Sequence, residues 1–241
     1  LLRMHYREAG LPENFQILDS DDQYRMIRRI LKALNLDEKH YPPRQAQGYI
    51  NGHKDEGLRP QHIEVYGDPF ERTLRDVYQT YQDACDRAGL VDFAELLLRA
   101  HELWLNNPQV LAHYRNRFRH ILVDEFQDTN SIQYAWLRVL VGDKGTITAV
   151  GDDDQSIYGW RGAKIENIQS LTKHFAEVQT IRLEQNYRST GQILKAANGL
   201  IRNNDDRLGK ELWTSSGEGE PISLYAGFNE QDEARFILDI V

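Results

Sequence analysis

The chain has 241 residues, of which 40% are hydrophobic and 27% are charged, and its formal net charge is −8. This composition is ordinary for a globular protein, and a single cysteine, Cys85, excludes a disulfide framework and favours a reducing, cytoplasmic setting. No apolar run approaches the ~20 residues that span a bilayer, so we expect no membrane partner.

The first half of the chain, residues 1–118, is expected to be helical throughout. An acidic capping cluster at residues 19–22 precedes apolar residues at helical spacing. A longer helix is predicted to begin after Pro69 and to stop at Gly89, with Cys85 as a buried structural thiol on its apolar face. The next helix is expected to turn five apolar residues inward: Phe93, Leu96, Leu97, Ala100 and Trp104.

Six basic residues of this helical region are candidates for facing DNA: Arg28, Arg29, Lys32, Lys54, Arg59 and His62. Solvated helix faces and loops are the favoured alternative for them. Three histidines lack the spacing of metal ligands and have no cysteine partners, so we expect no metal at His40, His53 or His62.

Short apolar runs at residues 120–123, 146–150 and 180–183 each end in polar residues, and a helical pattern follows each of them. This pattern predicts repeated strand–helix–strand units in which the polar residues at the strand ends lie along one functional edge of a sheet. The first run does not alternate, which predicts a strand buried on both faces, as in a parallel sheet covered by helices. A further strand is predicted at residues 221–225, and a last helix begins at residue 230.

The first strand ends in two adjacent carboxylates, Asp124 and Glu125. Ligands of open α/β sheets bind just beyond the carboxyl ends of the strands. In phosphoryl-transfer sites of this kind, one acidic residue holds Mg²⁺ and another orients or deprotonates the attacking water. We assign Mg²⁺ to Asp124 and the water to Glu125. The alternative is that two acids after a strand begin a solvated loop.

The polar segment after the second strand, residues 151–163, combines an amide, two aromatic rings and a guanidinium. The amide of Gln155 both donates and accepts, so it can report a γ-phosphate or its attacking water. Trp160 can stack a single-stranded base or anchor the loop in the core, and chemistry alone leaves these alternatives equal. Arg161 can pair with a phosphate, and Tyr158 lies close by in the sequence.

After the third run, Arg188 is a candidate arginine finger, because a planar cation at the γ-phosphate stabilises charge in the transition state. Tyr187 can stack on adenine. The alternative for Arg188 is a surface salt bridge. A second α/β unit is expected to begin near residue 185, so Asp124 and Arg188 belong to different units and we expect ATP to bind between them.

Three motifs follow one another along the chain: Val-Asp-Glu-Phe-Gln-Asp at residues 123–128, the segment 151–163, and Gln-Asn-Tyr-Arg-Ser at residues 185–189. With Gly-Leu-Val-Asp-Phe at residues 89–93, they resemble the UvrD/Rep/PcrA-type helicases of superfamily one over essentially the whole chain. The resemblance implies an α/β, P-loop NTPase (RecA-like) fold. It divides the chain into three parts: an inserted helical subdomain at 1–118, the second half of a first RecA-like domain at 119–184, and the beginning of a second at 185–241.

The resemblance also implies an ATP-dependent 3′–5′ DNA helicase or translocase of DNA repair and replication. ATP and Mg²⁺ would be its cofactors, and single-stranded and duplex DNA its partners. It gives Gln155 a coupling role, Trp160 base stacking with Tyr158 and Arg161 nearby, and Tyr187 and Arg188 contacts to ATP. The net charge argues against a broadly basic footprint, but stacking does not depend on it.

Two alternatives keep part of this interpretation. One is the motor subunit of a helicase–nuclease complex, and the other is a non-catalytic helical interaction module. Further expected partners are repair proteins, or a second copy of the chain that pairs with exposed strand edges.

The chain contains no Gly-x-x-x-x-Gly-Lys-Ser/Thr loop, since Gly-Lys at residues 209–210 is followed by Glu211. Carboxylates that hold Mg²⁺ still need backbone amides and a lysine to cradle the phosphates. Helicases of the resembled family carry that loop N-terminal to these motifs, and the helical pattern here starts at Leu1. We therefore expect an internal fragment of a longer enzyme that is inactive alone.

Overall fold

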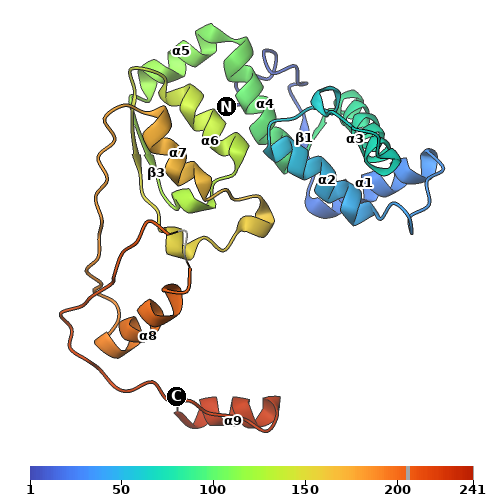
Figure 1. Ribbon diagram of the computed structural model, residues 1–241. Helices are drawn as coiled ribbons and strands as arrows, with labels where there is room; N and C mark the ends of the chain where they lie inside the picture. The colour runs from blue at the N-terminus through green and yellow to red at the C-terminus, as the bar shows by residue number, and fades with distance from the viewer. Residues whose placement is uncertain (205–206, 241) are drawn as a thin grey trace. The chain divides into compact units, whose positions relative to one another are not determined.

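The computed structural model describes residues 1–204 and 207–240, and the chain divides into two compact units, Leu1–Ala176 and Glu177–Val241. In the first unit, α4 (Phe93–Asn106) packs against both a helical region and a small α/β region (Figure 1). Across the described ranges, no helix is both long enough and apolar enough to cross a membrane.

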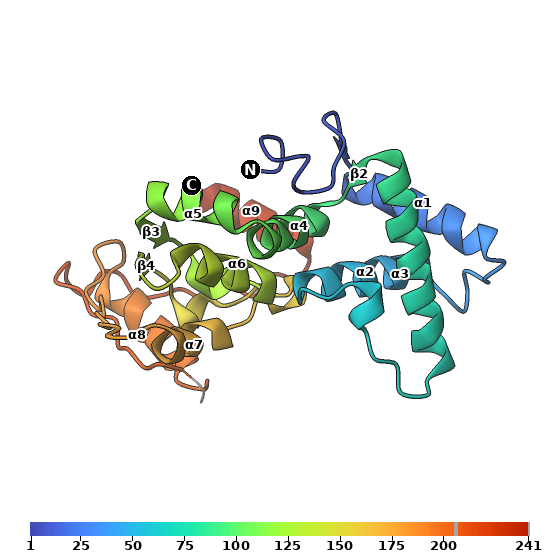
Figure 2. The ribbon, with the colours of Figure 1, turned by 90° about the horizontal axis from the view of Figure 1, so that it is seen from above.

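Three helices build most of the helical region: α1 (Ser20–Ala33), α2 (Pro43–Asp55) and α3 (Pro69–Ala88). They pack against one another (Figure 2). The predicted capping cluster is confirmed, because the Asp19 side chain accepts a hydrogen bond of 2.8 Å from the backbone amide of Asp22. This bond satisfies an amide that has no partner within the helix.

The core between these helices uses most of the apolar positions expected from the sequence, although Leu34, directly after α1, is 42% exposed. Cys85 is 2% exposed on α3, and burial raises the pKa of its thiol to about 12, as expected for a structural rather than a reactive thiol. Gly89 ends α3 with a φ of 64°, a left-handed conformation that glycine adopts without a Cβ clash. The apolar residues of this core that have no exposed surface are Ile27, Leu31, Ile50, Val77, Tyr78 and Tyr81.

The region is not helical throughout, which corrects the prediction. Residues 1–15 form turns and bends, and β1 (Gln16–Ile17) pairs in parallel with β2 (Leu90–Val91). Leu2 and Phe15 instead belong to an apolar cluster that contains Val91 of β2. Tertiary packing therefore overrides helical spacing at this end of the region.

The inward face of α4 differs from the prediction at its first residue. Phe93 is 62% exposed, because it follows directly on the capping residue Asp92 and lies outside the buried stripe. Ala100 and Trp104 are buried as predicted, whereas Leu96 and Leu97 are only partly buried. After α4 the chain turns into α5 (Pro108–Arg117).

Lys54 and Arg59 are buried in ion pairs, so the prediction that they could face DNA is wrong. Lys54 is fully buried, with its Nζ 2.7 Å from Asp92 Oδ2 and 2.9 Å from Glu95 Oε2. Arg59 pairs with Glu95 at 2.8 Å and with Glu102 at 2.6 Å. Burial alone would raise the pKa of the Glu95 carboxyl, but Lys54 and Arg59 lower it to about 2. These cations neutralise buried carboxylates instead.

The α/β region begins with β3 (His120–Val123), which pairs in parallel with β4 (Thr146–Ala149). The helix α6 (Ser131–Val141) connects the two strands, and α7 (Glu166–His174) follows β4. The predicted strand–helix–strand unit and the helix after it are confirmed. Parallel pairing brings the carboxyl ends of both strands to one edge of the sheet.

β3 is not buried on both faces, contrary to the prediction. Leu122 is 79% exposed. In the part of the chain that the structure describes, β3 pairs with β4 alone, so the cover of a larger sheet is absent here. An apolar strand in this state can pair with another chain.

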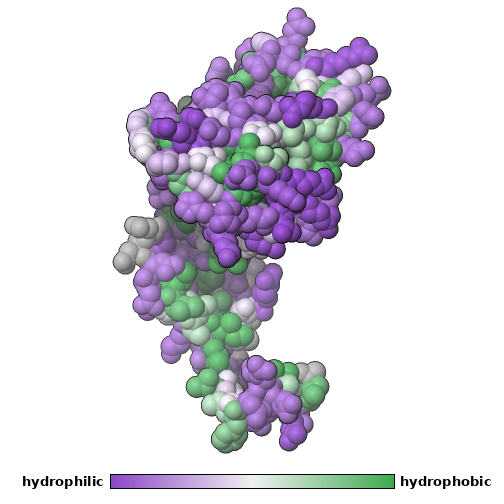
Figure 3. Space-filling model, turned by 90° about the vertical axis from the view of Figure 1, so that its right-hand side faces the viewer, coloured by the Kyte–Doolittle hydropathy of each residue, from purple (hydrophilic) through white to green (hydrophobic). Residues whose placement is uncertain are grey.

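In the second unit, α8 (Gly191–Ile201) and α9 (Glu230–Ile240) confirm the two predicted helices. The strands predicted at residues 180–183 and 221–225 are wrong, since neither segment forms a strand. A strand needs a partner, and both segments expose apolar side chains instead. Figure 3 shows hydrophobic residues at the surface of this unit. Exposed residues of this unit include Ile181, Leu183, Leu224 and Phe228.

Candidate active site

The turn after β3 presents both predicted carboxylates to solvent. Asp124 Oδ1 accepts a hydrogen bond of 2.9 Å from the backbone amide of Glu125. Glu125 has φ 49° and ψ 44°, a left-handed conformation that is uncommon outside glycine. The short helix η2 (Phe126–Asp128) begins at once, and Phe126 is buried. Such conformations persist where the surrounding structure holds them, often at functional sites.

Gln127 joins this turn to the loop after β4. Its side chain is 1% exposed. Its Nε2 donates a hydrogen bond of 2.7 Å to Glu125 Oε2, and its Oε1 accepts one of 3.0 Å from the backbone amide of Asp152. Sequence reasoning missed Gln127, because its role depends on the approach of two loops; its place inside the first motif was the available signal.

The two loops approach closely at Gly151. The amide of Val150 donates to Val123 O at 2.8 Å, and the amide of Phe126 donates to Val150 O at 2.9 Å. A Cβ atom on Gly151 would lie 2.8 Å from Gln127 Oε1, closer than atoms can pack. Any larger residue at position 151 would have to displace Gln127 or the neighbouring backbone, so glycine favours this approach.

Gln155 extends the same hydrogen-bonded chain. It ends the short helix η3 (Asp153–Gln155), where the Asp152 side chain accepts hydrogen bonds from the Asp154 amide at 3.0 Å and from Gln155 Nε2 at 2.7 Å. The structure thus brings Gln155 and Glu125 into one network through Asp152 and Gln127.

The aromatic end of the loop faces solvent. Trp160, within η4 (Gly159–Arg161), is 80% exposed, so it does not anchor the loop in the core. The Arg161 guanidinium carbon lies 5.2 Å from the ring centroid of Tyr158 and 5.4 Å from that of Trp160. Two rings and a cation therefore form one cluster that can take a base and a phosphate.

Asp124 fits the chemistry of a Mg²⁺ ligand. It is an exposed carboxylate steadied by the Glu125 amide, and Mg²⁺ in nucleotide sites commonly takes one or two carboxylates together with phosphate oxygens and waters. A second acidic group, at residues 152–154, has ligand atoms within 4.8 Å of one another. We assign no ion to it, because exposed acidic groups are common without one.

In the second unit, the motif at residues 185–189 forms a turn around Asn186. Its Oδ1 accepts hydrogen bonds from the amides of Arg188 at 2.9 Å and Ser189 at 2.7 Å. The Tyr187 ring is 79% exposed, and its hydroxyl donates to Gln185 Oε1 at 2.8 Å. Among residues 1–204 and 207–240, Arg188 makes no side-chain ion pair. The joint role of Asp124 and Arg188 stays a prediction.

The helical region meets the α/β region at a corner that the sequence did not predict. Asp55, the last residue of α2, accepts a hydrogen bond of 3.0 Å from Nδ2 of Asn130, which also caps α6. Lys164 Nζ lies 3.8 Å from Glu56 Oε1 beside it. Burial, and to a smaller extent the charge of Asp92, raises the pKa of Asp55 to about 6. The end of α2 thus contacts the chain just after each candidate loop, at Asn130 and at Lys164.

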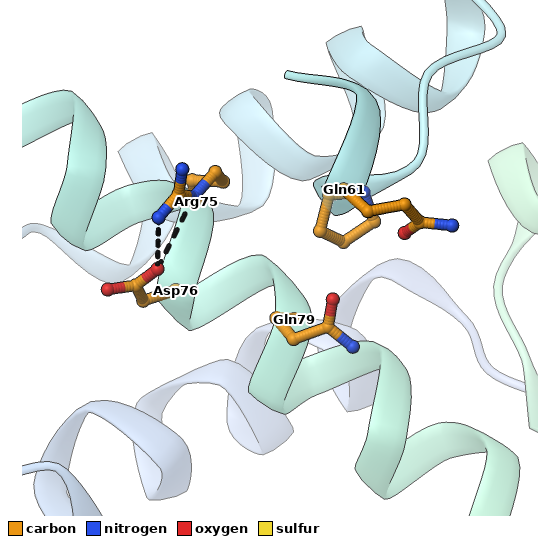
Figure 4. A pocket seen from close by; sticks show the side chains of 5 residues that line it. Gln61, Arg75, Asp76 and Gln79 are labelled. Atoms are coloured by element: carbon orange, nitrogen blue, oxygen red, sulfur yellow. Dashed lines mark hydrogen bonds and ion pairs between the residues drawn. The ribbon is translucent and has the colours of Figure 1, made fainter. Parts of the chain in front are cut away.

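A depression of about 250 Å³ lies on the helical region, between α3 and η1 (Pro60–His62). Figure 4 shows its polar lining, with Arg75 paired to its neighbour Asp76 at 3.0 Å. It contains none of the predicted site residues, so it lies outside the candidate site.

Known families match both units of the chain. Residues 1–176 match the UvrD/REP helicase N-terminal domain, and residues 181–241 match the UvrD-like helicase C-terminal domain. The chain is 68% identical over 239 residues to DNA helicase II of Escherichia coli strain K12 and 61% identical over 237 residues to DNA helicase II of Haemophilus influenzae. It is 41% identical over 239 residues to ATP-dependent DNA helicase PcrA of Leuconostoc citreum.

These alignments cover 98–99% of this chain and 32–33% of the relatives, so the chain spans about a third of their length. The N-terminal family match alone includes the strand-end carboxylates, the network around Gln127 and the aromatic loop. UvrD-like helicase domains imply a P-loop NTPase fold, with which the parallel β3–β4 pair and its helices agree. The chain therefore belongs to the UvrD/REP helicase family.

Proposed function

We propose that this chain is part of an ATP-dependent DNA helicase that moves 3′–5′ on single-stranded DNA and unwinds duplex DNA in repair and replication. Relatives that are 68% and 41% identical are named DNA helicase II and ATP-dependent DNA helicase PcrA. The observation that carries the proposal is the loop at residues 151–163. One end is hydrogen-bonded to the turn of Glu125, and the other exposes Trp160.

On the ATP side, Glu125 orients the attacking water and takes its proton, and Gln155 contacts the γ-phosphate or that water. Asp124 holds Mg²⁺, which neutralises phosphate charge when bound. Tyr187 stacks on adenine, and Arg188 stabilises the charge that develops on the transferred phosphoryl group. Support for these roles comes from exposed functional groups at the end of β3 and in the turn around Asn186.

On the DNA side, Trp160 stacks on a base of the single strand, Arg161 pairs with a phosphate, and Tyr158 completes the cluster. Movement of this cluster would displace Asp152, which lies on the same loop and contacts both Gln127 and Gln155. The location proposed with this function is the cytoplasm, in keeping with a single, buried cysteine.

The proposed division has a helical subdomain at residues 1–118, the second half of a first motor domain at 119–184 and the beginning of a second at 185–241. The boundary near residue 118 follows the change from helices to the β3–β4 unit. The Asp55–Asn130 contact would then join the helical subdomain to the first motor domain.

The test is ATP turnover, with and without single-stranded DNA, by the full-length protein that carries this segment. Wild type is compared with Glu125→Gln and with Glu166→Gln, an exposed carboxylate at the start of α7. A DNA-dependent rate that falls by about 100-fold or more in Glu125→Gln alone supports the proposal. An unchanged rate in Glu125→Gln contradicts the assigned base. The 241-residue chain is a third sample and should not turn over ATP, since it lacks a phosphate loop.

A further inference from the structure

Gln127 is held by both ends of its amide. Nε2 donates to Glu125 Oε2 at 2.7 Å, and Oε1 accepts from the Asp152 amide at 3.0 Å. The orientation of the amide follows from these partners, because a backbone N–H can only donate and an ionised carboxylate can only accept. A flipped amide would face a donor with a donor and an acceptor with an acceptor.

The position of Gln127 is as constrained as its orientation. The side chain is 1% exposed, and Gly151 lies so close that a Cβ atom there would meet Gln127 Oε1 at 2.8 Å. Glu125, by contrast, is exposed. Its carboxylate has several accessible rotamers, and the bond from Gln127 selects one of them.

We propose that Gln127 is a positioning residue that holds the Glu125 carboxylate in a geometry set by the loop of Asp152 and Gln155. The inference rests on the proposed function of Glu125 and deepens it. When the loop moves on binding DNA, the Asp152 amide moves Gln127, and Gln127 moves the carboxylate that orients the water. Single-stranded DNA thereby adjusts the rate of hydrolysis through one buried amide.

The first experiment measures kcat and KM for ATP, with and without single-stranded DNA, in the full-length protein. Gln127→Leu removes both hydrogen bonds at similar volume. Its DNA-stimulated kcat should fall by roughly 10- to 100-fold, because a displacement of ~1 Å at a catalytic group costs about that much. KM for ATP should stay within about threefold, since the buried Gln127 is proposed to act through Glu125 and not on the nucleotide itself.

The control variant is Gln133→Leu, which removes an amide from the same neighbourhood. Gln133 Oε1 accepts a hydrogen bond of 2.9 Å from the Asn130 amide at the start of α6, a capping role with no link to Glu125. Gln133→Leu should lower Tm and leave kcat unchanged at a temperature where the protein is folded. Equal effects of both variants on kcat would show a merely structural role.

A second variant covers the case in which Gln127→Leu does not fold. Gln127→Glu keeps the shape and the acceptor for the Asp152 amide, but an ionised carboxylate cannot donate to Glu125. Its kcat relative to wild type should be low at neutral pH. The ratio should rise as pH falls, because the protonated carboxyl of this variant can donate again. A ratio independent of pH and equal to one would overturn the proposal.

The two proposals fail in distinguishable ways. In the Glu125→Gln background, Gln127→Leu should cause no further loss, because residues that act as a unit are not additive. If Glu125→Gln collapses turnover while Gln127→Leu and Gln127→Glu keep wild-type kcat and DNA stimulation, the inference about Gln127 is wrong and the proposed function stands. If Glu125→Gln keeps wild-type turnover, the proposed role of Glu125 is wrong, and that of Gln127 with it.

Discussion

The Asp55 carboxylate, at the end of α2, accepts a hydrogen bond of 3.0 Å from the side-chain amide of Asn130, at the start of α6. This contact joins the end of α2 to the start of α6, which follows the turn that carries Asp124 and Glu125. Burial and the nearby Asp92 charge disfavour the ionised carboxylate and raise its pKa from 3.8 to about 6. The corner is therefore more stable when Asp55 is protonated.

Asp55→Asn should remove a pH dependence of stability. Because the folded pKa lies above the unfolded one, protonation of Asp55 stabilises the wild type below about pH 4, and this contribution is lost as pH rises through about 6. The variant keeps an oxygen that can accept the Asn130 bond, so its Tm relative to wild type should rise between pH 4 and 7. Glu56→Gln, at the half-exposed neighbour, is the control. Parallel Tm curves for Asp55→Asn and wild type would contradict the prediction.

Lys54→Met should destabilise the protein by about 3–5 kcal/mol, because it leaves Asp92 and Glu95 buried without their shared cation. Urea unfolding measures the change. Lys32→Met, on the exposed face of α1, is the control and should cost no more than about 0.5 kcal/mol. A similar small cost for Lys54→Met would show that the two carboxylates take up protons or other partners instead.

The sequence was sufficient for elements with strong local signals. Asp19 and Gly89 mark helix ends by side-chain and backbone chemistry that acts within a few residues, and both are found as predicted. The strands at residues 120–123 and 146–149 are found because each lies beside the other in a compact strand–helix–strand unit. The run at residues 180–183 has similar composition but forms no strand, since a strand depends on a partner as well as on its own residues.

The candidate site was predictable as a set of motifs but not as a network. Spacing indicated Glu125 and Gln155, yet the atoms that connect them belong to Gln127 and Asp152, whose roles depend on the approach of two loops. The burial of Lys54 is equally invisible to spacing, because its carboxylate partners lie about forty residues away in the chain. Contacts between distant segments are the part that local patterns do not encode.

Trp160→Ala should weaken binding of single-stranded DNA by about 1–3 kcal/mol, the worth of one stacked base, which is roughly 5- to 150-fold in Kd. Its Tm should not change, because the side chain is 80% exposed. Fluorescence anisotropy with a labelled oligonucleotide and the full-length protein measures the affinity. Tyr66→Ala removes an equally exposed aromatic ring, 85%, from the helical region and is the control. Unchanged affinity in Trp160→Ala would favour the interaction-module alternative.

Gly151→Ala should separate the two loops of the candidate site. The added Cβ would lie 2.8 Å from Gln127 Oε1, 3.2 Å from the Phe126 amide nitrogen and 3.3 Å from the Gln127 amide nitrogen, and backbone atoms cannot shift cheaply. We expect a loss of about 1–3 kcal/mol in urea unfolding, typical of overpacking, together with a lower DNA-stimulated kcat.

The matched control for this substitution is Gly159→Ala, on the same loop. A Cβ atom on Gly159 meets nothing within 4 Å, so the variant should change stability by no more than about 0.5 kcal/mol and leave kcat intact. If Gly151→Ala behaves like Gly159→Ala in both measurements, the loops have room that the contacts do not indicate. The close approach would then not be what links the Glu125 turn to the loop of Trp160.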